Sequence, residues 1–249
     1  MLIGSSLKMY FSHARTVEWM REVAAIVADH PAREYVTTFA IPQYPSIPAA
    51  VEIGGPAGIA IGAQDVATDD EGAFTGEVSG RVLAEIGCRY AEVGHAERRR
   101  LYGETEEVVA RKVHAALRNG LVPILCVGEA DEVEPAEAAA EAIRQIESGL
   151  AEARAAGAID DIVIAYEPLW AIGAPRPAGA DRIRAVCRAL RDHVRSAWPA
   201  PASVIYGGSA GPGLISDVSP DVDGLFLGRF AHDPAAFRAI LDEVVAISE

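Results

Sequence analysis

Short apolar runs alternate with longer amphipathic segments along all 249 residues, and this alternation limits the possible folds more than any other feature. The apolar runs predict strands at residues 2–7, 35–39, 58–61, 89–93, 121–127, 161–165, 203–206 and 222–227. The clearest helical patterns lie between them, at residues 14–29, 79–86, 105–119, 135–156, 180–197 and 234–248. The segments after the second and seventh strands leave room for short helices only. Eight such repeats in one chain of this length are typical of a closed (β/α)8 barrel with parallel strands.

A doubly wound open sheet is the structural alternative, because it also alternates strands with helices. Sheets of that kind that bind dinucleotides carry a Gly-x-Gly-x-x-Gly turn after the first strand, and no such turn follows residues 2–7. We therefore favour the barrel. No linker, low-complexity tract or block of like charges divides the chain, so we expect residues 1–249 to form one barrel domain.

The composition argues against several classes of partner. A formal net charge of −14 disfavours nucleic acid and anionic membranes, because both attract basic surfaces. The three cysteines, Cys88, Cys126 and Cys187, are odd in number and far apart, as expected for a reduced cytoplasmic protein. We find no basic leader before an apolar stretch, no apolar run of membrane-spanning length and no metal-ligand spacing. We therefore expect a soluble cytoplasmic protein, in which local donors still allow a small anionic ligand to bind.

Polar residues at the ends of the predicted strands are the candidates for function, because barrels of this kind carry their sites at the carboxyl ends of the strands. Those residues are Ser6, Lys8, Gln64, His95, Glu97, Cys126, Glu129, Glu167, Gly207, Gly208 and Ser209. A carboxylate, an imidazole and an ammonium group would then meet at one mouth of the barrel. Such a set suits proton transfer.

Glu167 ends an apolar strand and is followed by Pro168, Leu169, Trp170, Ala171, Ile172 and Gly173. A carboxylate is too costly to bury unpaired inside a dry strand, but at the end of the strand it can face a cleft. The apolar loop that follows can then cover the cleft and exclude water. The segment is typical of a catalytic base beneath a mobile lid, although a solvated glutamate before a turn has the same local pattern.

Two further segments suggest how a substrate is held. His95 precedes a short helical turn, whose positive end favours a neutral imidazole with one N–H free to polarise a carbonyl. Taken alone, a histidine in this position is more often structural. Gly207 and Gly208 lack a Cβ, so the backbone N–H groups of this turn can approach an anion. We expect the anion to be phosphate, because barrels of this kind recurrently bind phosphate in the loops after strands seven and eight.

Together these segments resemble the triosephosphate isomerase family along the whole chain. Residues 94–99 are similar to its electrophile motif, residues 165–173 to its base and lid, residues 206–209 to its phosphate turn and residues 126–129 to its fifth strand exit. The loop that resembles the family's dimer loop is Gly72-Ala73-Phe74-Thr75-Gly76-Glu77. The resemblance implies a TIM barrel that forms a homodimer through this loop.

The resemblance also implies residue roles. Glu167 would move a proton between adjacent carbons, His95 would polarise the carbonyl and Lys8 would stabilise the developing enediolate. The lid would exclude water and prevent loss of phosphate from the intermediate. The implied contacts to a small phosphorylated sugar are Ser6, Gly173, Gly207, Gly208, Ser209, Gly228 and Arg229, with Glu97, Cys126 and Ala96 in support. Neither a metal nor another cofactor is implied.

Four departures from the family pattern cluster near the expected site. Ser6 stands in place of an asparagine, Ala96 of a serine and Arg229 of a glycine, and Ala174-Pro175 replaces a flexible stretch after the lid. The first two changes remove about two heavy atoms and about one, which opens space beside the substrate. Arg229 is expected either to reach the phosphate as a bidentate donor or to point into solvent. The ring of a proline after the lid should stiffen it.

A tetrulose phosphate is a triose phosphate with one added hydroxymethyl group, about two heavy atoms, so the enlarged site leads us to expect an erythrulose phosphate isomerase. An authentic triosephosphate isomerase, interconverting dihydroxyacetone phosphate and glyceraldehyde 3-phosphate, is the alternative. A second alternative is a non-catalytic barrel that only binds a phosphate ligand. The presence of Lys8, His95 and Glu167 argues against this non-catalytic barrel, because binding alone needs no proton-transfer base.

Overall fold

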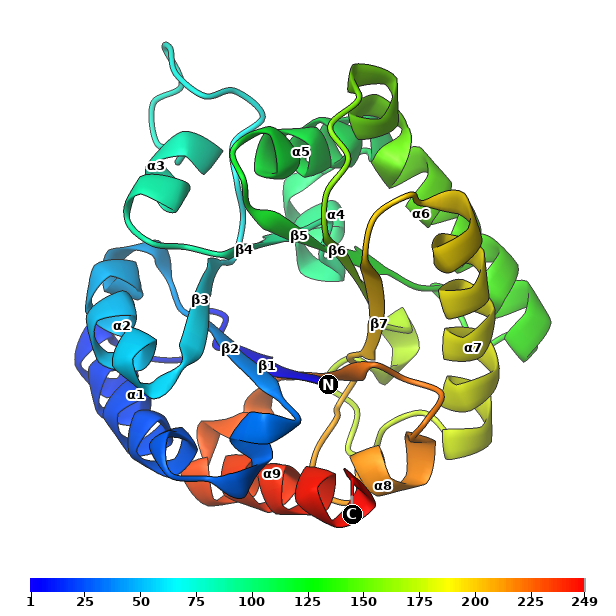
Figure 1. Ribbon diagram of the computed structural model, residues 1–249. Helices are drawn as coiled ribbons and strands as arrows, with labels where there is room; N and C mark the ends of the chain where they lie inside the picture. The colour runs from blue at the N-terminus through cyan, green and yellow to red at the C-terminus, as the bar shows by residue number, and fades with distance from the viewer. Residues whose placement is uncertain (249) are drawn as a thin grey trace.

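The computed structural model describes residues 1–248, which form a closed barrel of eight parallel strands in sequential order (Figure 1). β1 pairs with both β2 and β8, which closes the ring. The predicted (β/α)8 barrel is therefore confirmed. The strands are β1 (Leu2–Ser6), β2 (Thr37–Ile41), β3 (Ile59–Ala63), β4 (Tyr90–Val93), β5 (Val122–Val127), β6 (Ile162–Tyr166), β7 (Ala202–Tyr206) and β8 (Gly224–Leu227).

Helices surround the strands (Figure 1). They are α1 (His13–Ala28), α2 (Ile47–Gly54), α3 (Gly80–Glu85), α4 (Ala96–Tyr102), α5 (Glu106–Arg118), α6 (Pro135–Ala156), α7 (Ala180–Ala197), α8 (Leu214–Val218) and α9 (Pro234–Ser248). Short 3-10 turns are η1 (Pro31–Glu34), η2 (Tyr44–Ser46), η3 (Gly55–Ala57), η4 (Leu169–Ala171) and η5 (Arg229–His232). As predicted, the helices that follow β2 and β7 are short.

The predicted bounds of the second strand were wrong. β2 starts at Thr37 rather than Tyr35 and runs to Ile41. Pro31 begins the 3-10 turn η1, and Tyr35 caps that turn by donating its N–H to the carbonyl of Ala32. The residues just before the strand therefore belong to the turn, although their apolar character is typical of a strand.

Side chains fill the interior of the barrel. The inward-facing apolar cluster consists of Phe39, Ile41, Tyr90, Ile124, Cys126, Val163, Ala165, Ile205 and Phe226. The ring of Phe39 lies 5.1 Å from that of Tyr90 and 5.8 Å from that of Phe226, measured between centroids. Gly4 makes room for Phe39, because a Cβ at this glycine would lie 2.3 Å from the ring. The interior is thus a packed core, which places the site at one end of it.

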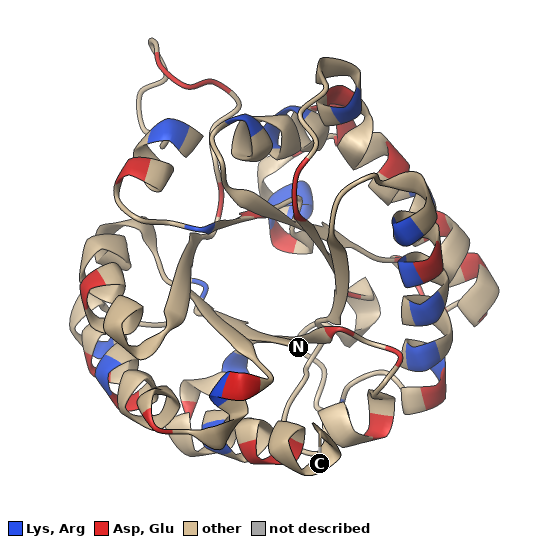
Figure 2. Cartoon of the chain, viewed as in Figure 1, with Lys and Arg blue, Asp and Glu red and all other residues tan. Residues whose placement is uncertain are grey.

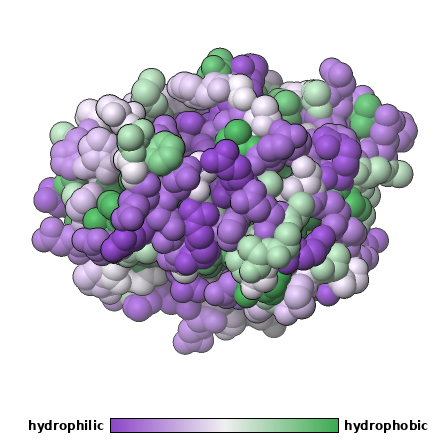
Figure 3. All heavy atoms as spheres, turned by 90° about the horizontal axis from the view of Figure 1, so that it is seen from above, coloured by the Kyte–Doolittle hydropathy of each residue, from purple (hydrophilic) through white to green (hydrophobic). Residues whose placement is uncertain are grey.

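Charged residues lie mainly on the outer helices and loops, whereas the strands are largely free of them (Figure 2). In the eight described strands the only charged residue is Glu92 on β4. The face seen at right angles to the view of Figure 1 is mostly hydrophilic with scattered hydrophobic residues (Figure 3). No helix among residues 1–248 combines the length and apolarity needed to span a bilayer.

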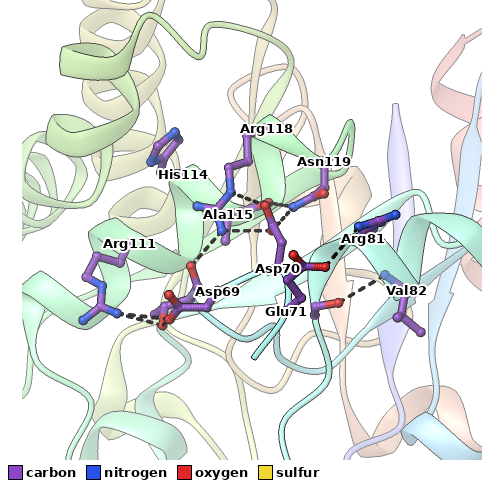
Figure 4. A network of polar contacts seen from close by, with 12 residues as sticks. Asp69, Asp70, Glu71, Arg81, Val82, Arg111, His114, Ala115, Arg118 and Asn119 are labelled. Atoms are coloured by element: carbon purple, nitrogen blue, oxygen red, sulfur yellow. Dashed lines mark hydrogen bonds and ion pairs between the residues drawn. The ribbon is translucent and has the colours of Figure 1, made fainter. Parts of the chain in front are cut away.

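The loop between β3 and α3 projects away from the barrel (Figure 1). Ion pairs hold its stem, joining Asp69 to Arg111 at 3.3 Å and Asp70 to Arg118 at 2.9 Å (Figure 4). Beyond this stem the side chain of Phe74 is 47% exposed. Helix α5 therefore fixes the base of the loop while its tip presents an aromatic ring to solvent.

Changing Gly4 to alanine should lower the free energy of unfolding by about 1–3 kcal/mol, because the added Cβ overlaps the Phe39 ring inside a packed barrel. Urea denaturation measures the change. Gly55→Ala is the matched control, since no atom lies within 4 Å of its added Cβ. Equal unfolding free energies for the two variants would contradict this view of the packing.

Candidate active site

The carboxyl ends of the strands surround a cavity of about 240 Å³. Residues from β1, β4, β8 and α4 and from the loops after β1, β4, β6, β7 and β8 line it, so segments distant in sequence meet there. Among the lining residues are Ser6, Lys8, Glu92, His95, Ala96, Glu97, Glu167, Leu169, Ile172, Gly173, Gly208, Ser209, Gly228 and Arg229. The three residues expected to be catalytic, Lys8, His95 and Glu167, thus face the same space.

His95 is held by the start of the helix that follows it. It is the N-cap of α4, and its Nδ1 accepts a hydrogen bond from the N–H of Glu97 at 3.1 Å. A ring nitrogen that accepts carries no hydrogen, so a neutral His95 carries its hydrogen on Nε2. Nε2 lies 3.4 Å from Oε2 of Glu167 and 3.9 Å from Oε1 of Glu92. The arrangement suits an imidazole that donates a hydrogen bond to a substrate oxygen.

Lys8 follows β1 in a left-handed backbone conformation, with φ of 47°. The side chain of Gln64 donates a hydrogen bond to the carbonyl of Lys8 at 2.9 Å. Nζ of Lys8 donates to Oε1 of Glu97 at 2.7 Å. Burial disfavours the charge on Lys8, but the hydrogen bond to Glu97 and the charges of Glu167, Glu97 and Glu92 outweigh it and raise the pKa of Lys8. The ammonium group is therefore a fixed positive charge beside the other two residues.

Glu167 is 7% exposed, and within residues 1–248 its Oε2 has no hydrogen-bond partner. Two glycines make room for it. A Cβ on Gly207 would lie 2.4 Å from Oε1 of Glu167, and a Cβ on Gly128 would lie 2.2 Å from its carbonyl oxygen. Gly207 does not line the cavity, and its N–H donates to the carbonyl of Tyr166 at 2.9 Å. Instead of facing a phosphate, as expected, Gly207 provides space for the carboxylate.

The remaining supporting residues touch the same group of side chains. Cys126 is buried, and burial together with the charges of Glu167 and Glu92 raises the pKa of its thiol well above the usual range. The thiol therefore stays uncharged beside the carboxylates. Ala96 is the first residue of α4 and lines the cavity without offering a polar group.

The first half of the segment expected to form the lid, Leu169 and Trp170, is bonded to Glu129. The N–H of Leu169 donates to the carbonyl of Glu129 at 2.9 Å, and Nε1 of Trp170 donates to its Oε1 at 3.0 Å. The hydroxyl of Tyr166 donates to the same carboxylate oxygen at 3.1 Å. Glu129 was read only as a strand exit, because its role depends on contacts that the chain makes only after folding.

The second half of the lid is fastened to the loops after β7 and β8. Oγ of Ser209 lies 3.0 Å from the carbonyl oxygen of Ala171 and 2.8 Å from that of Ala174. Nη2 of Arg229 donates to the carbonyl of Gly173 at 3.1 Å. Arg229 was expected either to reach the phosphate or to point into solvent. It is exposed and lines the mouth of the cavity, but its hydrogen bond goes to the lid. The two halves are also bonded to each other, since the N–H of Ala171 donates to the carbonyl of Pro168 at 2.9 Å and the N–H of Ile172 donates to that of Leu169 at 3.2 Å.

Glu92 was absent from the predicted site residues. It is 3% exposed, and its Oε2 accepts a hydrogen bond from Oγ of Ser6 at 2.8 Å. Burial and the charge of Glu167 raise the pKa of Glu92 to about 7, against the opposing effect of His95, Ser6 and Lys8. A carboxyl within the apolar run Tyr90-Ala91-Glu92-Val93 was the available signal, because burying such a group is costly.

A sequence model of the family described as triosephosphate isomerase matches residues 1–244. The chain belongs to the triosephosphate isomerase family. An L-erythrulose-1-phosphate isomerase from Pectobacterium atrosepticum is 47% identical over 249 residues, covering 99% of this chain and 96% of that protein. A triosephosphate isomerase from Thermus thermophilus is 37% identical over 247 residues, covering 96% and 97%. A triosephosphate isomerase from Cutibacterium acnes is 43% identical over 210 residues, covering 81% of each chain. The resemblance drawn from the motifs is confirmed, and the chain is an isomerase of this family.

Changing Gly207 to alanine should lower kcat of the isomerase at least about 100-fold, because the added Cβ displaces the Glu167 carboxylate from its position. Steady-state kinetics measure the loss, and near-UV circular dichroism reports whether the barrel stays folded. Gly179→Ala is the control, since nothing lies within 4 Å of its added Cβ. A folded Gly207→Ala variant with the kcat of wild type would contradict this role for Gly207.

Changing Glu92 to glutamine should alter how stability depends on pH. The pKa of Glu92 rises from 4.5 to about 7 on folding, so the native state holds a proton that the unfolded state has lost. Wild-type stability should therefore fall as pH increases through this window, and the variant should lack that fall. Between pH 5 and pH 8, the free energy of unfolding of the variant minus that of wild type should increase by up to about 3 kcal/mol. Urea denaturation at pH 5 and pH 8 measures this, and a pH-independent difference would contradict it.

Proposed function

We propose that this isomerase acts on a phosphorylated four-carbon ketose, an erythrulose phosphate. The observation that carries the proposal is the 47% identity, over almost the whole chain, to a protein named L-erythrulose-1-phosphate isomerase. The small side chains of Ser6 and Ala96 support it, because both line the cavity at positions where the family pattern has larger ones. Together they leave space beside the reacting carbons for one more hydroxymethyl group.

The chemistry of that substrate defines the reaction. When the phosphate is on C1 and the carbonyl is C2, the neighbouring carbon that carries both a hydrogen and a hydroxyl is C3. Removing the C3 proton gives an enediolate across C2 and C3. Returning a proton to C2, while the hydroxyl proton moves from O3 to O2, leaves the carbonyl at C3. The product is the ketose phosphate whose carbonyl lies one carbon further from the phosphate.

Three residues divide this work. Glu167 takes the proton from C3 and returns it to C2, because it lines the cavity and its Oε2 is shielded from water and free of hydrogen-bond partners among the described residues. Nε2 of His95 donates a hydrogen bond to the oxygen on which negative charge develops, and the charge of Lys8 stabilises the same oxygen. Glu97 positions both, since its N–H bonds His95 and its carboxylate bonds Lys8.

The phosphate occupies the cavity end formed by Gly173, Gly208, Ser209 and Gly228, where the lid meets the loops after β7 and β8. Backbone N–H groups at these glycines can approach phosphate oxygens closely. Arg229 adds positive charge at the mouth and is bonded to the lid residue Gly173. Phosphate binding and lid closure are therefore coupled in this proposal, because the same loops contact both the phosphate and the lid. The closed lid keeps the enediolate from water.

Triose phosphate is the second candidate substrate. Identities of 37% and 43% to triosephosphate isomerases favour it, and a three-carbon substrate fits wherever a four-carbon one does.

We propose further that the isomerase forms a homodimer through residues 72–77. An ion-paired stem supports this, because it holds the exposed ring of Phe74 out from the barrel, ready to enter a second copy. We also propose that the isomerase is cytoplasmic, because reduced cysteines are typical of that compartment and Cys88, Cys126 and Cys187 are free.

A comparison of kcat/KM for erythrulose 1-phosphate and for dihydroxyacetone phosphate tests the substrate. We expect the tetrulose to be favoured at least about tenfold. In D2O the product should carry deuterium at the carbon that receives the proton, as NMR can measure. Glu167→Gln should abolish turnover while phosphate-ligand binding persists, and Glu52→Gln, on the exposed face of α2, is the control. Equal or better turnover of the triose would refute the substrate assignment.

A further inference from the structure

Glu92 is a carboxyl group that the isomerisation does not use. One base, one hydrogen-bond donor and one cation carry the proposed reaction, and Glu167, His95 and Lys8 supply them. Glu92 nevertheless lies in the same cavity, 3% exposed, on a strand whose other residues are apolar. Burial of a second carboxyl beside the base is unfavourable, so the site keeps a group whose benefit must come from bound substrate.

The two oxygens of Glu92 are in different situations. Oε2 is held by the hydroxyl of Ser6 at 2.8 Å. Oε1 lies 3.9 Å from Nε2 of His95, which is beyond hydrogen-bonding distance. The Ser6 hydroxyl thus fixes the rotation of the carboxyl and leaves Oε1 as an acceptor beside the reacting groups.

The cavity has an exposed end and a buried end. Arg229 and Phe230 line the exposed end, next to the loops that hold the phosphate in our proposal. Ser6, Glu92 and Phe226 line the cavity too, and they are 4%, 3% and 3% exposed. A substrate whose phosphate lies at the mouth and whose reacting carbons lie at His95 therefore directs its far end towards Glu92.

We propose, on the basis of the four-carbon function argued above, that Glu92 is the specificity-determining residue for the terminal hydroxymethyl group. Its Oε1 accepts a hydrogen bond from the hydroxyl at the end of the substrate opposite the phosphate. Ser6 is the positioning residue, because its short side chain leaves the space that this group enters and its hydroxyl orients the carboxyl.

The same arrangement discriminates against a three-carbon substrate. When the lid closes over a triose phosphate, Oε1 of Glu92 is cut off from water and meets no hydroxyl donor. A buried acceptor without a partner is costly, and sites built to bond a hydroxyl reject analogues that lack it. One residue thus favours the tetrulose and disfavours the triose.

The test crosses two enzymes with two substrates. Erythrulose 1-phosphate is compared with the analogue that carries a methyl group in place of the terminal hydroxymethyl group. Assayed at pH 8, above the pKa of Glu92, wild type should prefer the hydroxylated substrate in kcat/KM by roughly 10- to 100-fold, the range for one hydrogen bond to a charged group. In Glu92→Leu, which removes the acceptor but keeps a similar volume, this ratio should fall to within about threefold. Ser6→Ala should lower the ratio less.

A merely structural role for Glu92 would lower the rates of both substrates together and leave their ratio unchanged, which would overturn the proposal. No preference in wild type for the hydroxylated substrate would overturn it as well. If Glu92→Leu does not fold, Glu92→Gln decides, since it keeps the shape and should lower the ratio at least about threefold through the lost charge. An unchanged ratio there counts against the proposal. Wild type that turns over triose but no tetrulose refutes the four-carbon function itself, and this inference with it.

Discussion

Two buried carboxyl groups lie within 4 Å of one imidazole nitrogen, and the site depends on how this crowding of polar groups is stabilised. The bond from the N–H of Glu97 to Nδ1 of His95 leaves Nε2 as the hydrogen-bearing nitrogen, 3.4 Å from Glu167 and 3.9 Å from Glu92. Neither carboxylate is stable there without local compensation. Lys8 supplies positive charge and Ser6 a hydroxyl, while Gly207 leaves the space that the base occupies. An apolar barrel thus concentrates its polar groups at one place, where a substrate meets them without competing water.

The lid extends this constraint to the loops around it. Its first half is bonded to Glu129 and its second half to Ser209 and Arg229, so its position depends on β5, β7 and β8 together. A phosphate bound between these loops would contact the same segments that hold the lid. Substrate binding and exclusion of water would then be physically coupled, as the proposed enediolate intermediate requires.

Much of this followed from the sequence because it rests on local rules. Alternation of strands and helices predicts the barrel, and parallel strands that exit at one end predict that Lys8, His95 and Glu167 meet. Contacts between distant segments were beyond those rules. Arg229 bonds to the lid and Gly207 packs under the base, and neither partner can be read from neighbouring residues. Glu92 is different, because the desolvation argument applied to Glu167 applies equally to a glutamate inside the run of β4. It was missed because only the residues at strand ends were considered.

In the proposed reaction, one substrate lies along the cavity with its phosphate at the mouth, its reacting carbons at His95 and its terminal hydroxyl at Glu92. A crystal structure of the Glu167→Gln variant with erythrulose 1-phosphate would reveal this orientation. In that structure we expect a hydroxyl oxygen within hydrogen-bonding distance of Oε1 of Glu92, and a substrate oxygen within the same distance of both Nε2 of His95 and Nζ of Lys8. A substrate bound in the opposite direction, or with its terminal hydroxyl in solvent, would contradict it.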